Sequence, residues 1–324
     1  MPLNLTAAYI QAPVKATTFN PITEFPDVFP KSVPNELPPL REPHMRHWIK
    51  LIDPEKIINP QVIPIAEKYY SQFREHMTKN LDSGRIYPSS SSQASAIFCV
   101  PKLANPQIAC FVMNFWARNL NTVKDRYPLS HIPTILNCLA KANYHSKINL
   151  IDAYFQIRVE PEDEKHTAFK TLDGWMYNSR VMQQGDCNSP STFMQIINYI
   201  LQAFLGIFVF VYLDDIFIYS NTLEDHIDHI KQVCLKLREH RLYASAKKSQ
   251  FFANKLEILG HYIDNQGIHA DPSKIEKIIN WPTLTSRKKV ERFNATVNYL
   301  SQYYNNLASC MAPLTSLMGK IKFY

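Results

Sequence analysis

Hydrophobic and polar residues alternate along this chain with the periods of both helices and strands. Apolar side chains recur at helical spacing over residues 60–81, and Gly84 follows as a C-terminal stop, so the pattern predicts an amphipathic helix there. The same pattern predicts further helices over residues 189–204, 222–242, 272–280 and 286–304. Short apolar runs predict strands: ASAIFCV, QIACFVMNF, YHSKINLI, YFQIRVE, TAFKT, WMYNSRVM, a hairpin over 207–220 and a strand pair in EILGHYIDNQGI. Because strands and helices do not strictly alternate, the pattern indicates a mixed α+β fold.

The N-terminal segment follows no such period. Residues 1–45 are rich in proline, and we expect an extended arm or linker there. The chain has 324 residues, of which 46% are apolar, so it is long enough for two domains or for one large domain with appendages. That apolar content excludes a disordered protein.

Cysteines and apolar stretches exclude other classes of protein. The six cysteines lie far apart without a CxxC pair, which favours free thiols over a zinc site or a disulfide framework. The most apolar stretch, residues 196–219, reads as a helix, Gly206 and a strand with two aspartates, so no membrane span is predicted. The N-terminus lacks the basic-then-apolar order of a signal peptide, and we expect an intracellular protein.

Positive charge gathers toward the C-terminus. The net charge is +7, and from Lys231 onward 15 lysines and arginines stand against 6 aspartates and glutamates. Such a basic region suits a polyanion such as nucleic acid, and a solvated helical face has the same composition.

Two adjacent carboxylates, Asp214 and Asp215, interrupt the apolar run FVFVYLDDIFIYS at residues 208–220. Burying two like charges side by side is costly. Neighbours on a regular strand point to opposite faces, so these two can share one site only near a turn. A divalent cation with hard oxygen ligands would hold both ionised, and a solvated Asp-Asp hairpin turn is the alternative.

The stretch YLDDIFIYS resembles the central signature of reverse transcriptases, RNA-directed DNA polymerases, in the form carried by gypsy-type LTR retrotransposons. Other stretches within residues 80–315 follow in that family's order and spacing: NTVKDRYPL, KINLIDAYFQIRV, EKHTAFKT, VMQQGDCNSPSTFMQ, LGHYID and GIHADPSKIEKIINWPT. The QQGDCN variant is similar to fungal elements in particular. The resemblance therefore covers most of the chain.

The resemblance implies an α+β right-hand polymerase with fingers, palm and thumb, in which a small antiparallel palm sheet is backed by helices. It assigns a Pro-rich linker to 1–45, mainly fingers to 46–145, palm to 146–265 with a fingers portion near 160–185, and thumb with the start of a connection to 266–324. No protease, ribonuclease H or integrase domain is expected in the chain.

The resemblance also implies nucleotidyl transfer on an RNA or DNA primer–template with deoxynucleoside triphosphates (dNTPs) and two Mg²⁺ or Mn²⁺ ions. Asp214, Asp215 and the backbone carbonyl of Leu150 would bind the metals. Lys248 matches a possible general acid for pyrophosphate, or is a solvated lysine. No membrane partner is implied, and the oligomeric state stays open.

On the nucleotide side, the resemblance assigns Lys102 and the backbone N–H groups of Asp152 and Ala153 to the triphosphate. Gln184 would lie against the incoming nucleotide. Tyr154 takes the place of an aromatic steric gate against the 2′-hydroxyl, and a core tyrosine is the other interpretation of the same residue.

On the primer side, Tyr212 would pack near the primer terminus or in the core. Gly260 and His261, in the stretch LGHYI, would belong to a primer grip. The thumb helices would present basic side chains to phosphates without regard to base sequence, through Arg287, Lys288, Lys289 and Arg292.

One position of the metal site departs from the family pattern. The family supplies a third metal-binding carboxylate in a pattern like L-D-L, where this chain has Ile148, Asn149 and Leu150. An amide oxygen is a far weaker ligand for a hard cation than a carboxylate. The Asn149 amide nitrogen could also face the metal instead of the oxygen.

Three positions predicted to lie in the fingers also depart from the family pattern, and they too indicate weakened synthesis. By alignment with the family, Cys110 replaces a triphosphate-binding arginine, Asn114 replaces an aspartate, and Trp116 replaces an arginine. The sequence therefore predicts a reverse transcriptase domain of a retrotransposon polyprotein whose fold survives and whose metal-dependent synthesis is impaired by Asn149. The alternative is a catalytically inactive, nucleic-acid-binding remnant of that domain.

Overall fold

The computed structural model describes residues 18–103, 105–264, 266–303 and 306–318. The chain divides into a larger unit, Pro13–Ser130 with Tyr144–Phe252, and a smaller unit that contains His131–Asn143 and Ala253–Tyr324. Among the described residues, the larger unit holds two β-sheets and the smaller unit holds one.

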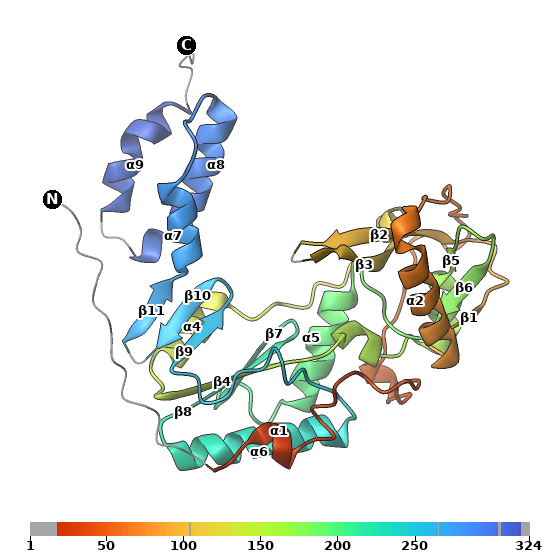
Figure 1. The fold of residues 1–324 in the computed structure, drawn as a ribbon, viewed down its shortest axis with the longest axis horizontal. Helices are drawn as coiled ribbons and strands as arrows, with labels where there is room; N and C mark the ends of the chain where they lie inside the picture. The colour runs from red at the N-terminus through yellow and green to blue at the C-terminus, as the bar shows by residue number, and fades with distance from the viewer. Residues whose placement is uncertain (1–17, 104, 265, 304–305, 319–324) are drawn as a thin grey trace. The chain divides into compact units, whose positions relative to one another are not determined.

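The first sheet of the larger unit has the strand order β1-β6-β5-β2-β3. Its strands are β1 (Ile86–Pro88), β2 (Ser95–Lys102), β3 (Asn105–Asn114), β5 (Phe169–Lys170) and β6 (Met176–Ser179). Helix α2 (Tyr70–Asp82) packs against β3 and β1 (Figure 1). Its residues Phe73 and Met77, one helical turn apart, are buried in one apolar cluster with Ile86 and Met113. This sheet and α2 are the elements that the sequence assigns to the fingers.

The second sheet of the larger unit carries the two adjacent aspartates. Its antiparallel strands are β4 (Tyr144–Asn149), β7 (Val209–Tyr212) and β8 (Asp215–Ser220), in the order β4-β8-β7. Helix α6 (Leu223–Glu239) packs against β8 and β4, and helix α5 (Ser189–Ile200) packs against β7 (Figure 1). Residues 216–218 of the central strand β8 are all buried, so this strand is covered on both faces.

The smaller unit joins a three-stranded antiparallel sheet to helices. Its elements are α4 (Ile132–Leu139), β9 (Lys255–Ile258), β10 (His261–Asp264), β11 (Gly267–Ala270), α7 (Pro272–Ile279), α8 (Arg287–Asn298) and α9 (Leu307–Ser316). Helices α7 and α8 begin after Asp271 and Ser286, whose side chains accept the backbone N–H groups of Ser273 and Lys289. Helix α8 packs against α7 and α9.

From residue 18 onward, the proline-rich N-terminal segment is part of the larger unit and packs into its core. Phe25, Val28 and Phe29 are buried in the same apolar cluster as the β4-β8-β7 sheet. Helix α1 (Pro21–Glu24) lies against α6 (Figure 1). The rest of the predicted arm, residues 1–17, lies outside the described residues. A free linker is therefore the wrong description of residues 18–45.

Three predicted elements differ from the structure. The helix predicted over 60–81 begins as a 3₁₀ turn at Glu67–Tyr69, because Pro64 disfavours helical backbone before it. The run YFQIRVE forms a 3₁₀ turn at Ala153–Gln156 and only isolated bridges after it. The stretch EILGHYIDNQGI belongs to three strands, β9 to β11, in place of two.

Short helical pieces complete the described chain. They are α3 (Trp116–Leu120) and 3₁₀ turns at Pro43–Met45, Pro161–Thr167 and Ser301–Tyr303. All six cysteines are free thiols. None of the helices in the described parts of the chain has the length and apolar character that a membrane crossing requires.

Candidate active site

The two aspartates lie at a tight turn. Tyr212 pairs with Asp215 across β7 and β8, so Leu213 and Asp214 form a two-residue connection. Leu213 has a φ of 52°, a left-handed conformation that is strained for a residue with a side chain. Its backbone N–H donates to Met194 Sδ on α5 at 3.1 Å, which holds the turn against the helix. Because Asp214 lies in the turn and Asp215 begins β8, the two carboxylates meet the condition stated above, that neighbours can share one site only near a turn.

Asn149 stands directly opposite Asp215. The two residues pair in the register of β4 and β8, and Asn149 Nδ2 donates to Asp215 Oδ1 at 2.8 Å. The backbone N–H of Asn149 donates to Ser249 Oγ at 3.1 Å, which fixes the end of β4. The Asn149 amide therefore donates a hydrogen bond to the Asp215 carboxylate. This bond occupies Asp215 Oδ1, an oxygen that could otherwise bind a metal ion.

Asp214 lacks such a partner. Its Oδ1 is buried and has no hydrogen-bond partner among the described residues. Burial and the neighbouring Asp215 raise the pKa of Asp214 above its usual value, while the Lys248 ammonium opposes that rise. A buried carboxylate oxygen without a donor needs a cation to stay ionised.

The donor set fits a divalent cation in part. The orphaned Asp214 Oδ1 suits a hard cation, and the backbone of Leu150 lies beside it, since the Leu150 N–H donates to the Asp214 carbonyl at 3.0 Å. Within the described residues, however, no three His, Cys, Asp or Glu side chains form a metal-binding group. Asp214 and Asp215 are thus the carboxylates that would hold a divalent ion, and Asn149 places an amide where the family pattern has a third carboxylate.

A cavity of about 330 Å³ lies in the larger unit among α2, β3 and the Asp152 turn. It has the size of a small-ligand site. Three of the residues that the sequence assigned to the nucleotide line it: Lys102, Asp152 and Gln184. Cys110 lines it as well, at the position where the family pattern has an arginine.

Two further cations, Lys79 of α2 and Arg85, also line this cavity, and neither was among the residues predicted to contact the nucleotide. Arg85 is 5% exposed, donates from Nη2 to the Pro34 carbonyl at 2.8 Å, and lies near Asp152, which favours its charge against burial. His76, one turn before Lys79 on α2, also lines the cavity and is neutral at pH 7, because burial and Lys79 lower its pKa to about 4. Helical spacing groups His76 and Lys79 on one face of α2, but only tertiary packing directs that face to the cavity and brings Arg85 to the same cavity.

The turn at Asp152 carries three residues that were predicted to contact the nucleotide: Asp152, Ala153 and Tyr154. Asp152 has a φ of 43° and starts the 3₁₀ turn, and Ala153 after it is buried. The Tyr154 ring packs edge-on against Phe193, with ring centroids 5.8 Å apart, and burial together with Asp214 raises its pKa to about 12. Phe155, not Tyr154, lines the cavity. This packing fits the core-tyrosine interpretation, and the steric gate stays a prediction.

Lys248 and Tyr212 lie in the larger unit with the aspartates. Lys248 is exposed and close enough to Asp214 to favour its charge. Tyr212 is half-buried at the end of β7. Both positions are compatible with the assigned roles, which stay predictions.

The predicted primer grip lies in the smaller unit. The His261 imidazole is only 3% exposed, and its two ring nitrogens contact the hydroxyl groups of Tyr299 and Tyr303. Gly260 has a φ of 77°, and a side chain there would collide with Lys274. The His261 side chain thus packs inside the unit, and its residue pairs with Ala270 and Ile258 on the two neighbouring strands, so its part in a primer grip stays a prediction.

The four basic residues of α8 are exposed but do not share one face. Lys288 and Arg292 lie opposite the buried side of the helix, which carries Val290 and Val297, and Lys289 lies on its flank. Arg287 lies nearer that side and pairs with Glu291 at 2.9 Å. Lys289 Nζ donates to the Thr285 hydroxyl at 2.7 Å, so among the described residues only Lys288 and Arg292 of the four have side chains without a partner.

Comparison with known proteins connects these features. Residues 103–263 match the family described as "Reverse transcriptase (RNA-dependent DNA polymerase)". The chain is 31% identical over 260 residues to a retrovirus-related Pol polyprotein from transposon 297 of Drosophila melanogaster, which covers 79% of this chain and 24% of that protein. It is 28% identical over 257 residues to the transposon Tf2-3 polyprotein of Schizosaccharomyces pombe, covering 79% of this chain and 19% of that one. It thus spans a quarter or less of the length of these relatives, and a fungal origin stays a prediction.

Solved structures show the same fold. A foamy viral protease–reverse transcriptase in complex with double-stranded DNA superposes with a TM-score of 0.81 at 21% identity, over 93% of this chain and 52% of that chain. The same type of protein in complex with an RNA/DNA hybrid gives a TM-score of 0.76 at 22% identity, over 93% of this chain and 40% of that chain. These likenesses confirm the predicted α+β right-hand polymerase fold.

Proposed function

The chain belongs to the reverse transcriptase family, as a domain of a retrotransposon polyprotein, and we propose that it binds a primer–template and a dNTP. In this proposal, both bind at a nucleotidyl-transfer site, and Asn149 limits the turnover of that site. The observation that carries this proposal is the contrast between two acids. Asp214 Oδ1 is buried without a partner, whereas Asp215 Oδ1 is taken by the Asn149 amide at 2.8 Å.

The charged side chains of this site would have different roles. Asp214 and Asp215 would hold divalent ions, Mg²⁺ or Mn²⁺, which when bound lower the pKa of a primer 3′-hydroxyl and neutralise the triphosphate. Lys248 stabilises the ionised form of Asp214. The rest of the catalysis is orientation and charge compensation by fixed groups.

The cavity beside Asp152 would hold the nucleotide. Lys102 would contact the phosphates, and Gln184 would contact the incoming nucleotide. The cavity also contains Lys79 and Arg85, so the loss of an arginine at Cys110 does not leave it without positive charge.

The primer–template would bind mainly through its phosphates. The neighbours of known structure are complexes with double-stranded DNA and with an RNA/DNA hybrid. In this chain, the exposed Lys288, Lys289 and Arg292 of α8 suit such contacts. Affinity would then fall steeply with salt, by a slope set by the number of phosphates neutralised. An intracellular location is part of this proposal.

Primer extension on an RNA template tests the proposal. We expect slow or no extension by the unmodified chain in Mg²⁺ and a gain of about 100-fold for Asn149→Asp, within the range that metal-site groups contribute. Asp214→Asn in the Asn149→Asp background should abolish that gain. Robust synthesis by the unmodified chain, equal to that of Asn149→Asp, would show that Asn149 does not limit turnover.

A second function, nucleic-acid binding without chemistry, is favoured by Asn149 and Cys110 together. It predicts primer–template binding with a steep salt slope and no extension, even after Asn149→Asp. The same set of variants therefore separates the two functions.

A further inference from the structure

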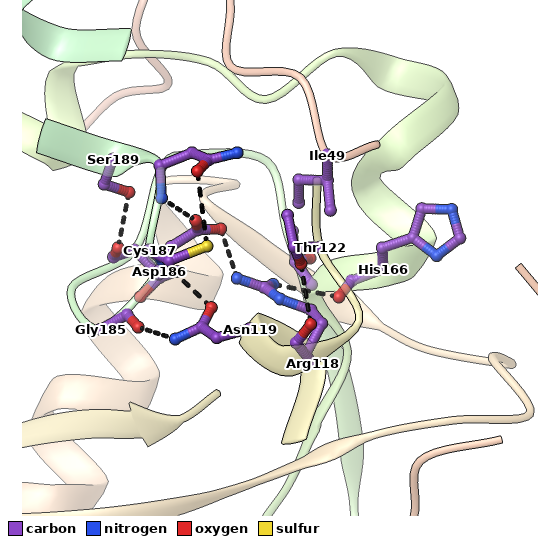
Figure 2. Close-up of polar contacts among 12 residues, drawn as sticks. Ile49, Arg118, Asn119, Thr122, His166, Gly185, Asp186, Cys187 and Ser189 are labelled. Carbon is purple, nitrogen blue, oxygen red and sulfur yellow. Dashed lines mark hydrogen bonds and ion pairs between the residues drawn. The ribbon is translucent and has the colours of Figure 1, made fainter. Parts of the chain in front are cut away.

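The segment that carries Gln184 into the nucleotide cavity is anchored on both sides of that residue. Before it, Gln183 Nε2 donates to Ser179 Oγ at 2.6 Å. After it, the carbonyl of Gly185 accepts from Asn119 Nδ2 at 2.8 Å (Figure 2). Gln184 itself is exposed in the cavity, and in the described part of the chain its side chain has no hydrogen-bond partner. The contacts of its neighbours thus position the backbone that carries Gln184.

Asp186 is the strongest of these anchors. Its Oδ2 accepts from Arg118 Nη2 (Figure 2) and from His47 Nε2, the latter at 3.1 Å, and its Oδ1 accepts from the Asn188 N–H at 2.9 Å. The side chains of Asp186 and Arg118 are 4% and 3% exposed. Burial alone would raise the pKa of Asp186, but Arg118 and His47 hold it well below its usual range. The carboxylate is therefore ionised and fully enclosed.

Arg118 and His47 are themselves held from other parts of the fold. Arg118 Nη1 donates to the His166 carbonyl at 3.1 Å, and its guanidinium lies 3.6 Å from the centroid of the Phe115 ring. His47 Nδ1 contacts Thr192 Oγ1 of α5 at 2.9 Å. Through Arg118 and His47, the Asp186 carboxylate thereby connects the chain at residue 47, α3, the turn at His166 and α5.

Gly185 fixes the backbone between this anchor and Gln184. It has a φ of 93°, and a Cβ at this position would lie 2.9 Å from the Met113 carbonyl oxygen of β3. Glycine is therefore required for this close approach. The backbone has little freedom to turn Gln184 in another direction.

A buried ion pair is a poor means of stabilising a fold. Replacing such a pair by apolar residues of similar volume is often neutral or stabilising, whereas the pair fixes geometry. Two apolar side chains at 118 and 186 could fill the same volume, but they would not tie Asp186 to four separate segments. The contacts of this pair favour a role in geometry.

We propose that Asp186 and Arg118 are positioning residues for the nucleotide, because their enclosed contact fixes the direction in which Gln184 meets an incoming dNTP. This inference rests on the proposed function, which supplies the dNTP as the ligand of the cavity.

A binding assay without chemistry tests the inference. The primer is ended with a dideoxynucleotide, the correct next dNTP is titrated in Mg²⁺, and the fraction of ternary complex that survives excess heparin is measured. Loss of one charge-assisted contact predicts that Asp186→Asn and Gln184→Ala each weaken dNTP binding by about tenfold. If Asp186 acts through Gln184, the double variant binds no more weakly than Gln184→Ala alone.

Two variants control for loss of folding. Glu164→Gln breaks another enclosed pair of the larger unit, with Arg158 at 3.4 Å, and should lower stability without changing dNTP affinity. Arg118→Lys keeps a cation beside Asp186 but cannot also reach the His166 carbonyl, so it should fold and weaken dNTP binding by a smaller factor. Primer–template affinity should stay unchanged in every variant.

Each result decides between the inference and the proposed function. An additive loss in the double variant, an equal loss in Glu164→Gln, or unchanged dNTP binding in Arg118→Lys overturns the inference and leaves the proposed function standing. If the unmodified chain binds primer–template but never traps dNTP, the nucleotide part of the proposed function fails and the inference fails with it.

Discussion

Replacing Asn149 by aspartate should make the stability of this protein depend on divalent ions. Asn149 Nδ2 now donates to Asp215 Oδ1 at 2.8 Å, so the substitution exchanges a donor for a second anion at the same distance. Without a metal ion, the new carboxylate faces Asp215 directly and lies in the same site as Asp214. The folded state should lose stability unless a cation binds.

The magnitude follows from two contributions. Loss of a hydrogen bond to a charged acceptor costs about 1.5–3 kcal/mol. Two unit charges about 4 Å apart repel by about 4 kcal/mol at an effective dielectric constant of 20, but these side chains are only half-buried, and one of them can take up a proton. We therefore expect Asn149→Asp to lower the free energy of unfolding by about 3 kcal/mol in EDTA. Mg²⁺ at about 100 times its Kd should restore about 2.7 kcal/mol, because it binds only the folded state.

Urea unfolding at low ionic strength, in EDTA and in Mg²⁺, measures both values. The matched control is Asn198→Asp on α5, because Asn198 is also half-buried and its amide donates to the Tyr127 hydroxyl at 2.9 Å, not to a carboxylate. This control should lose stability without recovering it in Mg²⁺. Equal stability of Asn149→Asp and the unmodified chain in EDTA, or the same Mg²⁺ response in Asn198→Asp, would refute the reasoning.

Three further perturbations test other contacts. Gly185→Ala should lower the free energy of unfolding by at least about 2 kcal/mol, because backbone strain adds to the close approach to the Met113 carbonyl. Gly174→Ala, with φ of 82° and nothing within 4 Å, should show the loss from strain alone, and urea unfolding of both variants measures the difference. His226 is fully buried between two serine hydroxyls, and burial lowers its pKa to about 3, below the unfolded value of about 6.5. Its contribution to the free energy of unfolding is therefore complete above about pH 6.5 and falls by about 2 kcal/mol by about pH 5. Thermal melts across this pH range should show a flatter dependence on pH for His226→Gln. Arg41→Met should cost about 2–4 kcal/mol, because Arg41 donates to the carbonyls of residues 156 and 240 at 2.7 Å each; a urea midpoint unchanged from that of the unmodified chain would contradict this.

The sequence predicted best where one periodic pattern decided the structure. The hairpin at 207–220 and helix α6 followed directly from apolar spacing and from the polar turn between the strands. The run YFQIRVE alternates like a strand, but the left-handed conformation of Asp152 turns it into a 3₁₀ turn, and a sequence does not display that backbone angle. Packing of the proline-rich segment was missed because extended backbone without a period gives no signal of burial.

The candidate site shows the same division. Residue types and order indicated which acids matter and that Asn149 is neutral. The direction of its amide depends on the β4-β8 register, and the cations Lys79 and Arg85 depend on where α2 packs. The contact between Arg118 and Asp186 joins residues 68 positions apart, so no local pattern could reveal it.

In the proposed metal site, Asn149 would weaken ion binding in two ways that can be measured separately. It removes a negative charge, and it also adds a donor that occupies Asp215 Oδ1. Asn149→Ala removes the donor without restoring the charge, so it should bind Mg²⁺ more tightly than the unmodified chain and less tightly than Asn149→Asp. Isothermal titration with Mg²⁺ and Mn²⁺ gives this order directly. If Asn149→Ala binds the ions no better than the unmodified chain, the missing charge alone explains the defect and the amide contact with Asp215 contributes nothing to it.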